Sequence, residues 1–249
     1  MKVSIITITF KDLDGLKRTL KSINDQTFKD FECLIVDGGS GPEVVQFLGG
    51  LNDPRISWIS EKDNGIFDAM NKGIENASGD WLMFLNGGDS FYSAETLEKV
   101  APALTSQHDL VYGNCLLEFS DGRTQLKTAR HHRFVFYGMF ANHQSMLFRK
   151  EFIGGVRYKP VFRIAGDYAF TSQTIKRGAR CLRLSEPICR FDMSGVSNQQ
   201  QGNGRRENWT VQRDILRVPL IARICIRGLY LTTASAKKLV NHFKVSDSP

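Results

Sequence analysis

Glycines and carboxylates gather where the apolar runs of this sequence end. The run WLMFL is followed by Asn86, two glycines and Asp89, and the run CLIV is followed by Asp37 and Gly38. Thr9 stands near the end of the first apolar run of the chain. A glycine has no Cβ and tolerates positive φ, so the backbone beside it can approach a bulky ligand closely. These hydroxyl, carboxylate and backbone N–H groups together predict a binding site for a polar ligand.

A second cluster of polar residues lies in the segment EKDNGIFDAMNKGI, residues 61–74. Its spacing predicts a helix that begins after Gly65 and carries Asp68 and Lys72. A helix N-terminus offers free N–H groups and a favourable dipole to a phosphate. Asp68 is therefore a candidate ligand-binding residue, and the rival interpretation is that it only caps the helix or interacts with its dipole.

Alternating strands and helices are expected to position these groups. Apolar and β-branched runs predict strands, and apolar residues at helical spacing predict helices. The predicted strands cover residues 3–10, 31–36, 56–60 and 81–85, and the predicted helices cover 13–23, 44–51 and 66–77. Strands that are apolar throughout are typical of a parallel sheet buried on both faces. The predicted fold class is therefore α/β, with a mainly parallel sheet flanked by helices.

Ligands of such sheets bind beside the carboxyl ends of the strands. This edge would bring Thr9, Asp37, Gly38 and residues 86–89 into one crevice, which suits a sugar nucleotide. DGGS and NGGD are also common turn compositions, so it is the order of the segments that favours a site. The sequence has neither GxGxxG nor a P-loop pattern, which leaves dinucleotide-binding and P-loop proteins without support.

Composition narrows the class of protein further. The 249 residues are 41% hydrophobic, which is enough for a full core. Residues 1–104 carry 10 basic against 16 acidic side chains, whereas residues 105–249 carry 23 against 10. Five widely spaced cysteines without a CxxC pair indicate neither a disulfide framework nor a zinc site. No apolar run reaches the roughly 18 residues of a transmembrane helix, and a cytoplasmic protein is expected.

Six segments in order resemble the family 2 glycosyltransferases, which have the Rossmann-like GT-A fold. They are VSIITITF, CLIVDGGS, EKDNGIFDAMNKGI, GDWLMFLNGGD, HQSMLFRK and AGDYAF. The resemblance is strongest to bacterial enzymes that build exopolysaccharides and O-antigens of lipopolysaccharide, such as colanic acid glycosyltransferases. It covers residues 1–195, with a nucleotide-binding half at 1–104 and an acceptor half at 105–195, and leaves 196–249 as a polar loop and tail.

The resemblance implies a nucleotide-sugar donor, with UDP as the default nucleotide. Thr9 and Asp37, with Gly38, would hold the base and ribose. Asp68 occupies a position where the family contacts the nucleotide, and Lys72 lies on the same helix.

The strand before Asn86 usually ends in an Asp-x-Asp motif in this family, whose carboxylates bind a divalent cation. Here Asn86 replaces the first carboxylate, and Asp89 is the predicted ligand of Mg²⁺ or Mn²⁺. Mg²⁺ needs few protein ligands, because waters and phosphate oxygens complete its shell. Asn86 would bond the ribose or an outer-shell water.

The family places its catalytic base where this sequence has Asp167, in FRIAGDYAF. Asp167 would deprotonate the acceptor hydroxyl and the reaction would invert the anomeric carbon. The rival interpretation makes Asp167 the N-cap of the following helix. His143 and Gln144 resemble a pair near the diphosphate or the acceptor. The remaining candidates, Arg205 and Arg206, would lie on a loop that closes over the diphosphate, or on a plain linker.

Residues 209–243 predict a basic amphipathic helix that is broken near Pro219. Such helices lie at the interface of anionic membranes, and the rival interpretation packs this helix on the core or on a second subunit. Membrane contact would place the enzyme peripherally on the inner face of the cell membrane, where a lipid-linked saccharide could be its acceptor. A sugar-nucleotide-binding protein without turnover stays open as an alternative. No nucleic-acid-binding signature occurs, so nucleic acid is not an expected partner.

Overall fold

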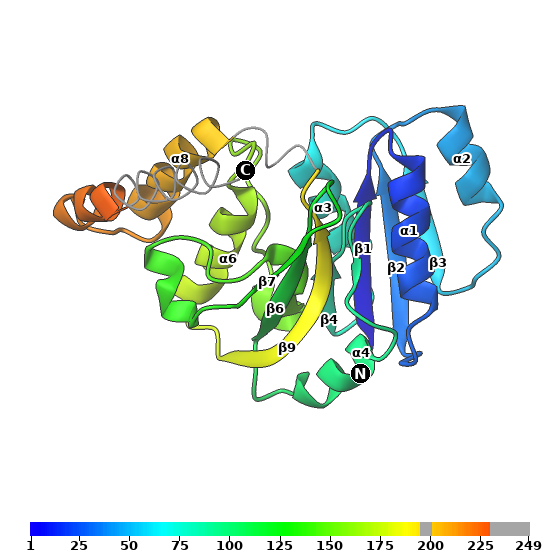
Figure 1. Ribbon diagram of the computed structural model, residues 1–249, viewed down its shortest axis with the longest axis horizontal. Coiled ribbons are helices and arrows are strands. Elements are labelled where there is room, and N and C mark those ends of the chain that lie inside the picture. Colours follow the sequence, from blue (N-terminus) through cyan, green and yellow to red (C-terminus); the bar gives the residue numbers. More distant parts are fainter. Residues whose placement is uncertain (195–200, 230–249) are drawn as a thin grey trace, which may run out of the picture.

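The computed structural model describes residues 1–194 and 201–229. Figure 1 shows a twisted sheet with helices on both faces. The strands expected in the first half are present, each within one residue of its expected bounds. In chain order the elements of this half are β1 (Val3–Thr9), α1 (Leu13–Asn24), β2 (Phe31–Asp37), α2 (Pro42–Gly49), β3 (Ile56–Ser60), α3 (Ile66–Asn76), β4 (Trp81–Phe84), β5 (Ser90–Phe91), α4 (Thr96–Val100) and η1 (Ala101–Ala103).

The second half has longer strands and shorter helices. Its elements are β6 (Leu110–Glu118), β7 (Thr124–Lys127), η2 (His132–Phe136), η3 (His143–Ser145), β8 (Met146–Arg149), α5 (Lys150–Ile153), α6 (Gly166–Lys176), β9 (Cys181–Asp192), α8 (Gln201–Thr210) and η4 (Val211–Ile215). A last helical stretch covers residues 220–229.

The strands form one sheet in the order β3-β2-β1-β4-β8-β6-β9-β5, with β7 paired to β6. From β3 to β4 every pair is parallel, as predicted. The second half is mixed, because β8 runs antiparallel to both β4 and β6, while β9 is parallel to β6. Strands β1 to β4 therefore form the parallel part of the sheet, and β8, β6 and β9 extend it as a mixed part.

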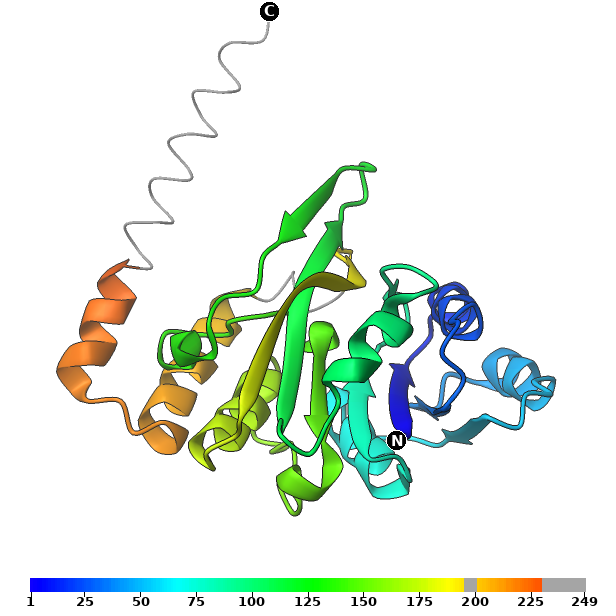
Figure 2. The ribbon, with the colours of Figure 1, turned by 90° about the horizontal axis from the view of Figure 1, so that it is seen from below.

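Both faces of β1 are buried, which explains its uninterrupted apolar sequence. Ile6 and Ile8 belong to one core cluster, and Val3 and Ile5 belong to the other. Helix α1 covers the second cluster and α3 covers the first, so the two helices lie on opposite faces of the sheet (Figure 2). The side chain of Asp12 caps α1 by accepting from the Gly15 N–H at 2.8 Å.

The structure of the C-terminal segment corrects part of the prediction of an amphipathic helix that lies on a membrane. Val211, Ile215, Leu216 and Val218 are buried in the core cluster that also contains Ile6, so residues 211–218 follow the rival interpretation and pack on the protein itself. The helix is broken before Pro219, as predicted. Figure 1 shows this segment at the end of the molecule furthest from α2. The predicted continuation to residue 243 passes residue 229 and so lies outside the described residues. Within them, no helix is long and apolar enough to cross a membrane.

Candidate active site

The carboxyl ends of β1, β2 and β4 meet at one edge of the sheet, where the sequence predicted a crevice. The register sets Thr9 beside Asp37, and the Gly38 N–H donates to the Thr9 carbonyl at 3.0 Å. On the other side, the Gly87 N–H donates to the Ile8 carbonyl at 2.9 Å. A Cβ added at Gly87 would lie 3.1 Å from the Thr9 hydroxyl oxygen. The structure thus brings together the three strand ends at which the sequence predicted a site.

Asp37 is fully buried beneath this crevice. Its Oδ2 accepts from the Ser40 N–H at 3.0 Å and from the Ser60 hydroxyl at 2.7 Å, and its Oδ1 accepts from the Ser40 hydroxyl. These bonds tie the turn after β2 to the end of β3, so Asp37 shapes the loop around Gly38. The direct contact with a nucleotide base that the resemblance implies stays a prediction.

Phe10 and Asp63, which were not singled out from the sequence, lie directly beside Gly38. A Cβ at Gly38 would lie 2.6 Å from Asp63 Oδ2 and 3.2 Å from Phe10 Cδ2. Phe10 is 58% exposed, which is unusual for a large aromatic ring that directly follows a buried strand. An aromatic face and a carboxylate beside a glycine suit a planar base that stacks and hydrogen-bonds. The sequence did contain a signal for Phe10, because this residue directly follows β1, just as the predicted site residue Gly38 directly follows β2.

Helix α3 begins at this crevice, after Gly65 with φ 110°. Asp68 Oδ2 accepts from the Asn64 N–H at 3.0 Å, which is the capping interaction of the rival interpretation. Lys72 lies 2.6 Å from Glu61 and 3.9 Å from Asp68, and the bond to Glu61 raises its pKa. Both predicted residues are thus near the helix N-terminus, and each already has a protein partner.

The segment NGGD forms a tight turn whose carboxylate faces β9. Asp89 is 5% exposed, and its Oδ1 accepts from the Asp192 N–H at 3.0 Å. Arg18 donates to Asp192 Oδ2 at 2.7 Å and to the Gly88 carbonyl at 3.0 Å. Asn86 Oδ1 is buried and has no hydrogen-bond partner among the described residues. An orphaned acceptor costs free energy unless a ligand or a water satisfies it.

The carboxyl groups of Asp89 and Asp192 are the groups here that fit a divalent cation. Burial, with the nearby charge of Asp192, raises the pKa of Asp89 to about 8. A bound cation would favour the ionised form of both groups. No cluster of three or more His, Cys, Asp or Glu side chains suited to a metal occurs in residues 1–194 and 201–229. Two carboxylates fit Mg²⁺ or Mn²⁺ only if a ligand's phosphate oxygens and waters complete the shell. Neither Arg18 nor Asp192 was singled out from the sequence.

Asp167 lies in the first turn of α6, and the residue that caps this helix is Ala165. The N-cap interpretation of Asp167 is therefore wrong. Asp167 Oδ1 accepts from the Tyr168 N–H at 2.6 Å. Burial raises the pKa of Asp167 to about 6, since the ionised form loses solvation. A carboxylate with this pKa accepts a proton more readily than an exposed one and is still mainly ionised at neutral pH.

His143 and Gln144 lie in η3 and are both buried, and their place near a diphosphate or an acceptor stays a prediction. His143 Nε2 lies 2.6 Å from the Tyr158 hydroxyl, and its ring stacks on Phe84 at 5.2 Å. Burial lowers the pKa of His143 to about 3, so the ring is neutral and supports Tyr158.

Tyr158, also missed in the sequence, is held by two further bonds. Asn71 of α3 donates to the Tyr158 carbonyl and accepts from its N–H, both at 2.9 Å. Burial, with the charge of Asp167 as a smaller cause, raises the pKa of Tyr158 well above its usual value. His143, Tyr158 and Asp167 thus form one connected group.

Arg205 and Arg206 lie on helix α8 and are exposed, so the loop expected around them is wrong. The residues that precede α8, 195–200, lie outside the described part of the chain. A contact of either guanidinium with a diphosphate stays a prediction.

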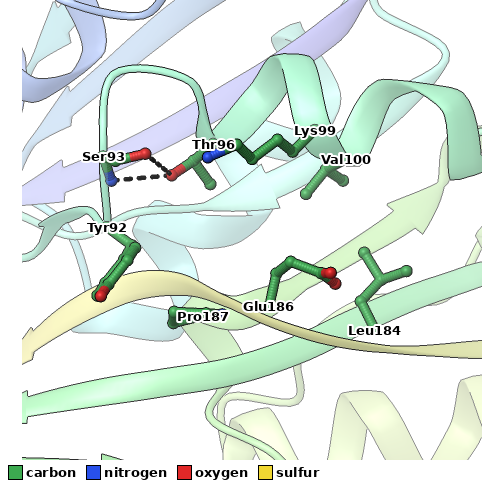
Figure 3. Close-up of a pocket in the computed structure, with 8 residues that line it drawn as sticks. All are labelled: Tyr92, Ser93, Thr96, Lys99, Val100, Leu184, Glu186 and Pro187. Carbon is green, nitrogen blue, oxygen red and sulfur yellow. Dashed lines mark hydrogen bonds between the residues drawn. The ribbon is translucent and has the colours of Figure 1, made fainter.

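Two cavities lie away from the crevice. Figure 3 shows the first, about 70 Å³, where Tyr92, Lys99 and Val100 face Leu184 and Pro187 across the gap between α4 and β9. It is far smaller than the roughly 300 Å³ of an ordinary ligand pocket. The second, about 730 Å³, opens at the amino ends of the strands beside Met1 and Trp81. None of the predicted site residues lines either cavity.

Comparison with known proteins agrees with this architecture. Residues 4–170 match the family described as Glycosyl transferase family 2. An uncharacterized glycosyltransferase of Mycobacterium tuberculosis is 33% identical over 212 residues, which cover 80% of this chain and 78% of the relative. A PGL/p-HBAD biosynthesis glycosyltransferase of Mycobacterium bovis is 30% identical over 255 residues, which cover 97% and 93% of the two chains.

Solved structures agree in fold. S. aureus TarS 1–349 in complex with UDP-GlcNAc superimposes with a TM-score of 0.68 at 18% identity, over 86% of this chain and 65% of that one. The mannosyltransferase PcManGT from Pyrobaculum calidifontis, in complex with GDP-Man and Mn²⁺, gives a TM-score of 0.67 at 12% identity, over 87% and 64%. This chain therefore spans just under two thirds of each of these solved chains. The shared fold is GT-A, as the resemblance implied.

Proposed function

Because this chain belongs to glycosyl transferase family 2, we propose that it is an inverting glycosyltransferase that moves a hexose from a nucleotide sugar to a saccharide hydroxyl. The observation that carries this proposal is Asp167, a half-buried carboxylate in the first turn of α6 whose pKa is raised to about 6 by loss of solvation. A general base works best when its pKa lies near the working pH. His143, with a pKa of about 3, is too weak a base for this step.

The chemical step follows from one base and one leaving group. Asp167 takes the proton of the acceptor hydroxyl, whose oxygen forms a bond to the anomeric carbon. The bond from that carbon to the β-phosphate oxygen breaks, and the nucleoside diphosphate leaves with the electron pair. Attack from the face opposite the diphosphate inverts the anomeric carbon.

The donor nucleotide is proposed to occupy the crevice at Thr9 and Gly38. Phe10 would stack on the base and Asp63 would accept a hydrogen bond from it, while the N-terminus of α3 faces the phosphates. TarS is described with UDP-GlcNAc and PcManGT with GDP-Man. UDP is the default nucleotide of the proposal, and GDP is its competitor.

Asp89 and Asp192 are proposed to hold Mg²⁺ or Mn²⁺ against the diphosphate. When bound, the cation would neutralise negative charge that builds on the departing diphosphate. Arg18, 2.7 Å from Asp192, would orient that carboxylate, whose pKa is lowered against its burial by hydrogen bonds from Ser194 and then from Arg18. Asn86 Oδ1, which has no partner among the described residues, would accept from a ribose hydroxyl or from an outer-shell water.

The acceptor is proposed to be a saccharide carried on a lipid, in the synthesis of a bacterial surface polysaccharide. Leu220, Ile221, Ile224 and Leu229 of the last helical stretch are all more than half exposed. Residues 105–249 also carry 13 net positive charges. Exposed apolar residues on a basic segment favour binding to an anionic membrane, which would keep the protein peripherally on the inner face of the cell membrane.

Calorimetric titration with UDP, GDP and dTDP, each with and without Mg²⁺ or Mn²⁺, tests the donor site. We expect selective binding of one nucleotide that strengthens with metal, and Asp89→Asn should lose the metal enhancement. Asp121→Asn, an exposed carboxylate paired with Arg123, is the matched control. Absence of binding to all three nucleotides would refute the proposal. Tight binding with no turnover on membrane-derived acceptors would indicate a sugar-nucleotide-binding protein instead.

A further inference from the structure

Glu207 of α8 holds the chain segment that leads into α6. Its Oε1 accepts from the Arg163 N–H at 2.9 Å, and its Oε2 accepts from the Ile164 and Ala165 N–H groups at 2.8 and 2.7 Å. Three hydrogen bonds to an ionised carboxylate are stronger than their neutral counterparts. The segment ends two residues before Asp167, so this clamp fixes the backbone from which α6 starts.

The approach of α8 to this segment depends on a small residue. A Cβ at Gly204 would lie 3.2 Å from Ile164 Cγ2, which is a tight contact. One turn later, Trp209 lies beneath the guanidinium groups of Arg223, at 4.6 Å, and Arg227, at 5.8 Å. Helix α8 therefore connects the start of α6 to the last helical stretch of the described chain.

Charged groups from several elements surround Asp167. Burial is the main cause of its raised pKa, the Tyr168 N–H and Lys127 at the end of β7 act to lower it, and the Glu207 carboxylate acts to raise it. The hydroxyl of Tyr158 is a further titratable neighbour. Glu207 is thus linked to Asp167 through the backbone and through its charge.

We propose that Glu207 is a positioning residue of the glycosyl transfer, which holds residues 163–165 so that the carboxylate of Asp167 points at the acceptor hydroxyl. This inference rests on the proposed function, because it takes Asp167 as the base. Glu207 was not predicted from the sequence, because it lies in a polar, Gln- and Arg-rich segment in which a single carboxylate does not stand out.

The variant Glu207→Gln tests the clamp at nearly constant size. A glutamine offers one oxygen in place of two, and its NH₂ group would face a backbone N–H, so the segment 163–165 should loosen. Loss of the negative charge should also lower the pKa of Asp167, so the acidic limb of the rate profile should move to lower pH. We expect kcat to fall by about 10- to 100-fold, because a misplaced base of this kind loses effective molarity. Nucleotide affinity should not change, since Thr9 and Gly38 do not contact Glu207.

The control is Asp214→Asn, which removes a carboxylate from the same C-terminal segment. Asp214 pairs with Arg213 and makes no hydrogen bond to residues 163–165. Three readouts are compared between the full-length wild type and the two variants. They are amide hydrogen exchange in residues 163–165, the titration of the Asp167 carboxyl by ¹³C NMR, and the release of UDP from UDP-GlcNAc or GDP from GDP-mannose.

Faster exchange, a lower Asp167 pKa and a lower kcat in Glu207→Gln alone would support the positioning role. Unchanged exchange and titration would overturn it, and so would wild-type turnover despite a loosened segment. Exchange and titration need no turnover. A wild-type chain that releases no nucleotide, yet shows the Glu207-dependent titration of Asp167, would therefore refute the proposed reaction while leaving the clamp established.

Discussion

Two titratable side chains near the proposed acceptor site, the buried His143 and the half-buried Asp167, respond oppositely to loss of solvation. Burial raises the pKa of Asp167 to about 6 and lowers that of His143 to about 3, because in both residues it disfavours the charged form. At neutral pH Asp167 is a carboxylate with increased proton affinity, whereas His143 is a neutral ring bonded to Tyr158. Of these two residues, Asp167 therefore has the pKa that suits the base of the proposed transfer, because of its surroundings and not because of its residue type.

The pH dependence of transfer should therefore report Asp167. The reactive form is the carboxylate, so the rate should rise with pH and reach half of its plateau near pH 6, the pKa of this group. Asp167→Asn should bind nucleotide normally but lose about 10²- to 10⁴-fold in kcat, the usual contribution of a general base. Initial rates from pH 5 to 8 on saturating donor check both points. Asp121→Asn should keep the wild-type profile, and a normal rate for Asp167→Asn would remove the assignment.

Side chains that end a predicted strand could be placed from the sequence, but their distant partners could not. Thr9, Gly38 and Asn86 are found where the order of strands put them, because parallel strands share one edge. Asp192 pairs with Arg18, which is 174 positions away in the sequence. No local sequence pattern predicts a pair between residues so far apart. The burial of the His143 ring is likewise visible only in the fold, and its contact with a diphosphate or an acceptor stays a prediction.

At the scale of elements, the apolar runs predicted every strand of the parallel half, because a strand buried on both faces has an unmistakable pattern. The mixed half was harder to predict. Strand β9 alternates apolar with charged residues, and β6 is interrupted by Gly113, where a Cβ would lie 2.6 Å from the Glu186 carbonyl.

Gly73 lets α3 pack directly on β1. A Cβ at this position would lie 2.3 Å from Ile6 Cγ2, so Gly73→Ala must shift the helix or the strand. We expect a net loss of about 1–3 kcal/mol of unfolding free energy, the usual cost of overpacking a core, despite the better helix propensity of alanine. Urea denaturation measures it. In the Ile6→Ala background the same substitution should cost much less, and an equal cost there would contradict the steric explanation.

Asp109 joins three segments at the start of β6. Its carboxylate is 2.6 Å from Arg149 of β8 and 2.9 Å from Arg180, and the residue is 1% exposed. The bonds to Arg180 and Arg149 hold the pKa of Asp109 far below its usual value. Asp109→Asn should destabilise the protein by about 1.5–3 kcal/mol at pH 7, because it removes a buried carboxylate that accepts charge-assisted hydrogen bonds from the partly exposed Arg149 and the half-exposed Arg180.

The sign of the pH effect on Asp109 follows from its lowered pKa. The stabilisation is fully present above the unfolded pKa of about 3.9 and is lost as pH falls towards the folded value. Urea midpoints of wild type and Asp109→Asn should therefore converge below about pH 4. A constant difference from pH 7 down to pH 3 would show that packing, and not charge, is responsible.

At the scale of the whole molecule, the charge division of the sequence follows the division of the sheet. Residues 1–104, which form the parallel half, carry six net negative charges, and residues 105–249 carry 13 net positive charges. The tail was predicted as an amphipathic helix broken near Pro219, and the structure has this break, with a part before it that packs on α6 and a stretch after it with exposed apolar residues. A hydropathy pattern alone cannot distinguish a helix face that meets the core from one that meets a membrane.

Residues 220–229 should therefore mediate binding to an anionic membrane. Ile221 is 77% exposed, and its insertion into the interface would remove apolar area from water. In vesicle flotation, Ile221→Glu should bind phosphatidylglycerol-containing vesicles about 10-fold more weakly, since it loses that apolar transfer and adds a repelled charge. Val161→Glu, at a residue that is 76% exposed but lies before α6, is the matched control. Wild-type binding should also weaken with added salt, because basic side chains contribute to it. Equal binding of wild type and Ile221→Glu would instead show that this helix does not mediate the membrane contact.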